Sequence, residues 1–265
     1  MQNDFYDSHM HTELCKHAKG EPEEYAEAAI DRGLAGITFT CHNPIPGGYS
    51  ADARMRPEQF DDYVALIGRA RDAYKGRLDV RLGLESDYFP GAEPWLEQLH
   101  PRAEFHYILG SVHPQIKAYQ ARYFTGDVLA FQETYFNHLV MAAETGLFDA
   151  LSHPDLVKNE HPQQWRLPRL MDHIKRSLDR IAATGIAMEL NTSGVNKALP
   201  QMNPGPEILA EMARRKIPVV LGSDSHVPHR VGDGFETATK LLKEAGFTHV
   251  SVFDNRKRRE IPIRD

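Results

Sequence analysis

The sequence predicts an α/β barrel of seven parallel strands, and three observations support this fold class. Short, apolar, β-rich segments alternate with longer amphipathic segments along the chain, and such alternation implies a parallel sheet with right-handed crossovers. Polar residues stand at the carboxyl end of nearly every expected strand, where a barrel gathers its active site from many loops. An open, doubly wound sheet would concentrate them at one switch point, and the chain has no glycine-rich phosphate loop.

The expected elements follow one another in a regular order. The strands cover residues 5–9, 35–40, 79–85, 105–112, 149–152, 186–190 and 217–222. The helices cover about 21–33, 57–75, 92–99, 127–146, 168–184, 206–215 and 234–245. Gly33, Gly146, Gly185 and Gly246 stand where C-terminal caps are expected, and Pro57, Pro168 and Pro206 stand at first turns. Because no linker, repeat or low-complexity stretch interrupts this order, we expect residues 1–265 to form a single domain.

The charge balance excludes some partners. The formal net charge of −6 and the pI near 6.2 argue against nucleic acid or an anionic membrane, because both need a basic face. The one dense basic cluster, Arg256–Arg259, is interpreted as a solvated turn or tail. We expect a small-molecule partner and a monomer or small homo-oligomer.

The chain also has the features of a cytoplasmic protein. No apolar stretch approaches the roughly 20 residues needed to cross a bilayer. The polar start Met1-Gln2-Asn3-Asp4 lacks the basic and then apolar pattern of a signal peptide. Cys15 and Cys41 are the only cysteines, which excludes a disulfide framework and suits a reducing compartment.

Histidines at the strand ends indicate a metal site. His9 and His11 end the first apolar run, and residues i and i+2 of a strand point to the same face, so both imidazoles can reach one cation. Asp224 and His226 follow the last expected strand at the same spacing. The other candidate ligands at or after the strands between them are His17, His42, Glu85, His113 and His153.

This set predicts the chemistry of the site. Nine candidate ligands exceed the four of one tetrahedral site, so two or three metal ions are expected, with Glu85 bridging. The donor set suits zinc, iron or manganese. A strongly positive pocket in an acidic protein favours a small anion, phosphate above all. A hydroxide bridging two ions would attack phosphorus while the ions stabilise the equatorial and leaving oxygens.

The same motifs resemble those of a known family. The set His9-x-His11, His17, Thr40-x-His42, Gly83-x-Glu85, Ser111-Val112-His113, His153 and Ser223-Asp224-x-His226 is similar to the PHP (polymerase and histidinol phosphatase) superfamily. Within it, the runs Leu14–Ala18, Arg54–Gly91 and Glu189–Gly194 look like the histidinol-phosphate phosphatase branch. The resemblance covers essentially the whole chain.

This resemblance implies a fold, a cofactor and a reaction. The fold is a distorted (β/α)7 TIM-like barrel, and the cofactors are three divalent metal ions per chain. By motif, one ion is held by His9, His11, Glu85 and Asp224, the second by Glu85, His113 and His153, and the third by His17, His42 and His226. Glu85, Asp224 and His226 are the residues expected to carry catalysis. The implied reaction is hydrolysis of L-histidinol phosphate to L-histidinol and phosphate, in histidine biosynthesis.

The chain departs from the family pattern at several positions. Cys41 stands where the family often has an aspartate that would orient His42, and a buried free thiol is favoured over a thiolate ligand. Lys158 and Lys197 lie where the family often has arginines, and lysine binds phosphate as a point charge without the bidentate fork.

Other loop residues are weaker candidates for substrate contacts. Arg54 and Arg230 lie in loops at the expected active-site face and are candidate phosphate ligands. His229 is a candidate proton donor to the leaving alkoxide, since imidazole titrates near neutral pH. The aromatic run Tyr119, Tyr123 and Phe124 either lines the substrate pocket or packs within its loop.

Three alternatives to the main prediction stay open. The same site could act on another small phosphate ester, such as a nucleotide or sugar phosphate. It could be an amidohydrolase-like C–N hydrolase, because a bridging hydroxide also attacks carbonyl carbon. A non-enzymatic binding or proofreading-associated module is disfavoured, because the ligand set is full.

Overall fold

The computed structural model describes residues 4–264 and places seven parallel strands side by side in chain order. These are β1 (Tyr6–Asp7), β2 (Gly36–Phe39), β3 (Asp79–Asp87), β4 (Tyr107–Ser111), β5 (Ala150–Leu151), β6 (Ala187–Asn191) and β7 (Val219–Gly222). The first and last strands also meet, because the amide of Ser8 donates to the carbonyl of Leu221 at 3.0 Å and Met10 bridges to Ser225. The predicted seven-stranded barrel is therefore confirmed.

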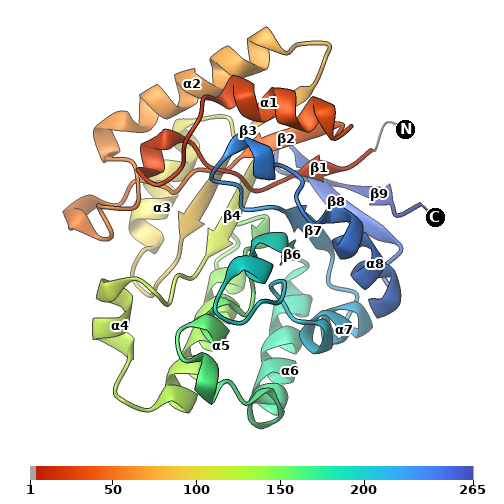
Figure 1. The fold of residues 1–265 in the computed structure, drawn as a ribbon. Helices are drawn as coiled ribbons and strands as arrows, with labels where there is room; N and C mark the ends of the chain where they lie inside the picture. Colours follow the sequence, from red (N-terminus) through yellow and green to blue (C-terminus); the bar gives the residue numbers. More distant parts are fainter. Residues whose placement is uncertain (1–3, 265) are drawn as a thin grey trace.

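Eight α-helices among the described residues surround this sheet (Figure 1). They are α1 (Pro22–Asp31), α2 (Phe60–Ala73), α3 (Glu93–Leu99), α4 (Lys117–Tyr123), α5 (Val128–Glu144), α6 (Leu167–Thr184), α7 (Pro206–Arg214) and α8 (Phe235–Ala245). In α6 the buried side chains recur every three or four residues, at Leu170, Ile174, Leu178 and Ile181, which is the apolar stripe of a helix packed on a core. Gly185 and Gly246 end α6 and α8 with φ values of 74° and 100°, a backbone conformation that glycine adopts without a steric penalty.

Two elements were not expected from the sequence. Helix α4 is only seven residues long and buries a single side chain, that of Tyr119, so its sequence has no apolar stripe that would mark a helix. Its Tyr119 packs against α5 and shares a hydrogen bond of 2.7 Å with Nδ1 of His138, so this aromatic run packs between helices. The second element is an antiparallel hairpin of β8 (His249–Asp254) and β9 (Lys257–Pro262).

The hairpin covers the amino-terminal end of the barrel. Phe253 packs against Tyr107 inside the barrel, with ring centroids 5.3 Å apart. The basic cluster Arg256–Arg259, expected as a solvated turn or tail, forms the hairpin turn and the start of β9. Arg256 and Arg258 donate to the carbonyls of Leu147 and Gly185, each at 2.9 Å. The expected solvated turn is thus found, with mostly exposed side chains, and two of its arginines also satisfy backbone groups just before β5 and β6.

The ends of the described chain lie beside each other, linked by an ion pair of 2.7 Å between Asp4 and Arg264. Residues 1–3, which belong to the polar start considered above, lie outside the described part of the chain. Among residues 4–264, every helix is too short or too polar to serve as a membrane span. The single domain over residues 1–265 and the oligomeric state stay predictions.

Candidate metal centre

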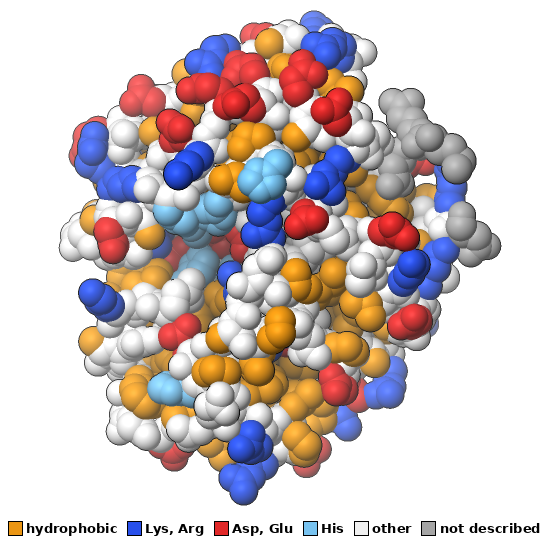
Figure 2. Space-filling view, in the orientation of Figure 1, with side chains coloured by type: hydrophobic (Ala, Val, Ile, Leu, Met, Phe, Trp, Pro, Cys, Tyr) orange, Lys and Arg blue, Asp and Glu red, His pale blue; other side chains and the backbone are white. Residues whose placement is uncertain are grey.

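The nine predicted ligands meet at the carboxyl-terminal end of the barrel strands. His9 and His11 follow β1, Glu85 lies in β3, and Asp224 and His226 follow β7. Figure 2 shows histidine side chains gathered in a hollow on one face of the molecule. The cavity there has a volume of about 260 Å³, and its lining consists of His17, His42, Glu85, His113, Gln115, His153, Leu156, Lys197, Asp224 and His226.

The first group of ligands joins the two ends of the barrel. The Nε2 atoms of His9 and His11 lie 3.2 Å apart, and that of His11 lies 3.2 Å from Oδ1 of Asp224. The Nε2 atom of His9 lies 3.6 Å from the same oxygen. Such a convergence of two imidazole nitrogens and one carboxylate oxygen has the donor atoms of a transition-metal site.

Glu85 connects this group to a second one. Its Oε1 atom lies 3.3 Å from Nε2 of His113 and 3.1 Å from Nε2 of His153. Its Oε2 atom lies 3.5 Å from Nε2 of His9 and 2.7 Å from Nδ1 of His42. Because its two oxygens face different imidazoles, Glu85 has the geometry of a bridging carboxylate.

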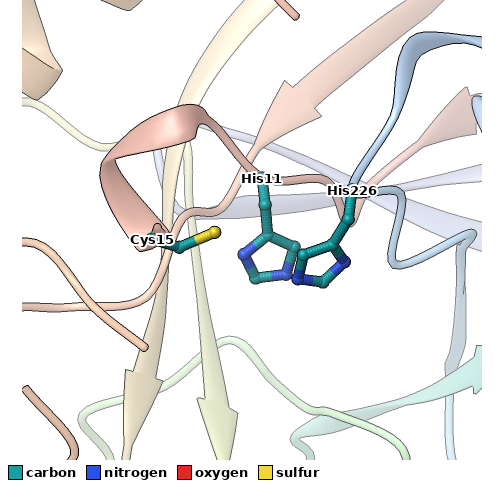
Figure 3. Close-up of side chains that lie close together, drawn as sticks. All are labelled: His11, Cys15 and His226. Atoms are coloured by element: carbon teal, nitrogen blue, oxygen red, sulfur yellow. The ribbon is translucent and has the colours of Figure 1, made fainter. Parts of the chain in front are cut away.

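The third group consists of His17, His42 and His226, whose ligand nitrogens lie within 4.8 Å of one another. The rings of His17 and His226 have centroids 4.5 Å apart. Figure 3 shows the rings of His11 and His226 side by side, with the sulfur of Cys15 directed toward His11. These two rings stack with centroids 4.0 Å apart and an interplanar angle of 18°.

The crowding of these groups sets their protonation. Burial raises the pKa of Glu85, but the facing imidazoles, that of His42 foremost, outweigh burial and hold the pKa well below its ordinary value. The pKa of Asp224 is lowered in the same way. Burial and the neighbouring His11 lower the pKa of His226 to about 2, and burial lowers that of His42 to about 4 despite the nearby Glu85. At neutral pH these two carboxylates are anionic and these two imidazoles neutral, which are the forms in which such groups bind metal ions.

The residues fit divalent metal ions. His226 Nε2 and His11 Nδ1 are buried, and within residues 4–264 they have no hydrogen-bond partner. Such unsatisfied buried groups are rare unless a water or ion completes them. His11 has a pKa raised to about 9, because hydrogen bonding and charge from its neighbours, with Asp224 foremost, outweigh the effect of burial. A bound cation would take the place of that proton opposite the carboxylates.

Two ligands adopt a strained backbone. His153 has a φ of 24° and Asp224 a φ of 50°, in the left-handed region that non-glycine residues rarely enter. Such residues cost about 1–3 kcal/mol each and cluster at functional sites. The fold therefore holds these two side chains at the centre at some expense of stability.

Two buried carboxylates behind the ligands were missed at the sequence level. Glu189 Oε1 lies 2.7 Å from Nδ1 of His9, and Asp87 Oδ1 lies 3.0 Å from Nδ1 of His113. Asp87 could have been identified from the sequence, because it follows Glu85 by two residues in β3 and lies on the same face of the strand. Glu189 is an acidic residue within the apolar strand β6, which is the kind of exception that marks a site.

The substrate-binding candidates separate into two classes. Lys197 is half-buried and lines the cavity. Lys158 is fully buried, and its Nζ donates to Asp155 at 3.0 Å and to the carbonyl of Met202 at 2.8 Å. Its ammonium group is thus engaged inside the protein and does not line the cavity, so Lys158 supports the fold where a phosphate contact was expected.

Arg54 is similarly engaged away from the cavity. Only 2% of it is exposed, and its guanidinium donates to Asp87 at 2.8 Å and to the carbonyl of Asn43 at 2.9 Å. Asp87 in turn faces the candidate ligand His113. Arg54 is therefore linked to the metal centre by Asp87, and its guanidinium is not directed at a substrate phosphate.

The remaining candidates lie on the loop after β7. Arg230 pairs with Asp233 at 3.6 Å, and the exposed His229 accepts a hydrogen bond from Arg32 through its carbonyl. Neither lines the cavity. Cys41 is a buried free thiol whose sulfur accepts a hydrogen bond from the hydroxyl of Thr12 at 3.2 Å, in agreement with the interpretation preferred from the sequence.

The chain is similar to several known proteins over nearly its whole length. The chain is 39% identical over 267 residues to a Deinococcus radiodurans protein named "Probable histidinol-phosphatase", covering 95% of this chain and 97% of that one. It is 27% identical to the histidinol-phosphatase of Bacillus subtilis, covering 87% and 96% of the two chains. The crystal structure of histidinol phosphate phosphatase from Lactococcus lactis, complexed with zinc, L-histidinol and phosphate, matches with a TM-score of 0.81 at 20% identity. That match covers 97% of this chain and 99% of the other, and it shows the shared fold.

A family model also matches directly. The model of the PHP domain matches residues 7–193, which include the ligands from His9 to His153. This span and the 39% identity over nearly the whole chain show that the chain belongs to the PHP domain family.

Proposed function

We propose that this protein is a metal-dependent phosphomonoesterase that hydrolyses L-histidinol phosphate to L-histidinol and phosphate. The observation that carries the proposal is a cavity lined by five histidines, two carboxylates and a lysine, with His9 and His11 in contact with those carboxylates. Relatives named as histidinol-phosphatases over nearly their whole lengths support this substrate.

The cofactors proposed are three divalent ions per chain, as zinc, iron or manganese. His9, His11, Glu85 and Asp224 would hold one, Glu85, His113 and His153 the second, and His17, His42 and His226 the third. Bound there, the ions would supply an activated water and positive charge for the phosphoryl oxygens.

Side chains of the protein would bind the substrate and hold the ligand groups in position. Lys197 lines the cavity and, as a flexible cation, can contact a phosphate oxygen of the substrate. Glu85 and Asp224 stay anionic at neutral pH and so keep the ligand groups opposite them in place. The backbone around His153 and Asp224 is already in its strained conformation, so little reorganisation is needed when substrate binds.

The test is phosphate release from L-histidinol phosphate beside a panel of nucleotide and sugar phosphates. Protein loaded with zinc, manganese or iron should give a kcat/KM at or above roughly 10⁴ M⁻¹s⁻¹ for histidinol phosphate and far less for the panel. H11N should abolish this activity, whereas H249N, at an exposed histidine of β8, should retain it. If an ester of the panel is the best substrate, the proposed substrate is wrong. If no ester is hydrolysed, the proposed phosphatase activity is wrong.

A further inference from the structure

Glu189 occupies a position between two groups of ligands. It lies in β6 and is only 1% exposed. Its Oε1 atom faces Nδ1 of His9 at 2.7 Å. Its Oε2 atom accepts hydrogen bonds from the backbone amide of His153 at 2.8 Å and from Nδ2 of Asn191 at 3.0 Å. One carboxylate thus contacts a ligand of the first proposed ion and the backbone of a ligand of the second.

The direction of these hydrogen bonds determines the state of His9. The backbone N–H of His153 and the side-chain amide NH2 of Asn191 can only donate, and an ionised carboxylate can only accept. The Nδ1 atom of His9 must therefore carry the proton that it shares with Glu189. With Nδ1 occupied in this way, Nε2 is the nitrogen that a metal ion would bind, and it is the atom directed at His11 and Asp224.

A glycine makes this contact possible. Strand β7 lies between β6 and the start of the chain, and Gly222 pairs with Asn191. A Cβ atom at Gly222 would approach the Cβ of His9 to 2.6 Å and would collide with the carboxylate of Glu189. A side chain at this position would therefore separate Glu189 from His9.

We propose that Glu189 is a positioning residue, which fixes the tautomer of His9 and the loop of His153 so that both ligands face the metal ions. This inference rests on the proposed function, because it concerns the metal site of that enzyme. Carboxylates that hold ligand histidines typically contribute 10–100-fold to metal affinity.

The substitution E189Q tests the proposal while preserving shape. If the amide oxygen keeps the bonds from His153 and Asn191, the amide nitrogen must donate to Nδ1 of His9, and the proton moves to Nε2. If the amide is reversed, its NH2 group faces the backbone N–H of His153 and the side-chain NH2 of Asn191. Each buried donor left without an acceptor costs about 1–3 kcal/mol. The first arrangement blocks the metal-binding atom of His9, and the second displaces the backbone of His153, so each weakens the metal site.

The readout is zinc affinity, measured on full-length protein by competition with a chromophoric chelator. E189Q should bind its weakest zinc about 10–100-fold less tightly than the wild type, and E189D, which keeps the acceptors, should recover part of the loss. The matched control is E93Q, because Glu93 accepts from Tyr88 and Gly91 outside the centre. Long-range ¹H–¹⁵N spectra of zinc-loaded protein should show His9 protonated at Nδ1 in the wild type and not in E189Q.

The outcomes separate the two proposals. Wild-type zinc affinity and an unchanged His9 tautomer in E189Q would overturn the positioning role while leaving the phosphatase intact. A wild-type protein that binds no zinc, iron or manganese would overturn both. If E189Q does not fold, G222A provides the second variant: the positioning role requires a weakened zinc site there also, and an unchanged one in folded G222A refutes it.

Discussion

Replacing Arg54 by methionine separates two roles for this residue. The sequence suggested a phosphate contact, in which case R54M would raise KM and leave the free energy of unfolding unchanged. In the structure the guanidinium and the carboxylate of Asp87 form an ion pair of 2.8 Å, with only 3% and 2% of the two side chains exposed. The structural role therefore predicts a loss of stability first and a loss of activity second.

The magnitude follows from the charge that is left behind. Burial alone would raise the pKa of Asp87, but the neighbouring positive charges, with Arg54 foremost, outweigh burial and lower it. The carboxyl group is therefore ionised in the folded protein. Removing one partner of a buried ion pair typically costs about 3–5 kcal/mol, because the other charge stays desolvated without compensation. For a domain of this size each kcal/mol lowers Tm by about 2–4 °C, so R54M should unfold roughly 10 °C below the wild type.

The assay is thermal and urea unfolding of chelator-treated protein, so that metal binding does not mask the difference. R71M, at an exposed arginine in the last turn of α2, is the matched control and should stay within about 0.5 kcal/mol of the wild type. An R54M protein as stable as R71M, with only its KM raised, would refute the structural role and restore the phosphate contact.

Three further predictions concern residues around the same barrel. K158M should lose about 3–5 kcal/mol in urea unfolding, because Asp155 stays buried without its partner; unchanged stability with a raised KM would contradict this. K197M should unfold like the wild type, while its KM and its inhibition constant for inorganic phosphate each rise about tenfold, and unchanged values would remove Lys197 from the substrate site. Burial and the nearby Arg256 lower the pKa of His100 to about 4, so its neutral form is favoured by folding. This preference adds roughly 3 kcal/mol to the free energy of unfolding above about pH 6.5, and the gain is lost as the pH falls toward 4. In H100Q the free energy of unfolding should therefore fall less steeply between pH 6.5 and 4, and a pH dependence parallel to that of the wild type would refute the assignment.

The fold was predictable where the signals are local and repeated. The alternation of apolar runs and amphipathic segments located all seven barrel strands, and Gly185 and Gly246 located two helix ends. The hairpin of β8 and β9 was missed because its exposed residues Lys257–Glu260 read as a charged tail. Their partners are carbonyls just before β5 and β6, and no pattern within the tail itself reports such distant acceptors.

The positions of the candidate ligands were predictable for a related reason. A parallel barrel brings the carboxyl ends of all its strands to one rim, so nine residues from distant segments could be expected in one place without knowledge of their contacts. Two of the cationic candidates did not follow this rule. Arg54 and Lys158 come from loops at that same rim, yet each is buried against an aspartate. Whether a loop cation faces the cavity or the protein depends on the position of its carboxylate partner, which strand order alone does not specify.

Glu189 shows why the residues behind the ligands need the three-dimensional arrangement. It is 180 residues from His9 in sequence, and its strand β6 is separated from the start of the chain by β7. The two side chains meet across β7 because Gly222 has no side chain to stand between them. The contact thus depends on three strands at once: a carboxylate on one, a glycine on the next and a histidine beyond it. His9 and Glu189 each stand out in their own segments, but nothing in either segment says that they pair, and only closure of the barrel between β1 and β7 brings them together.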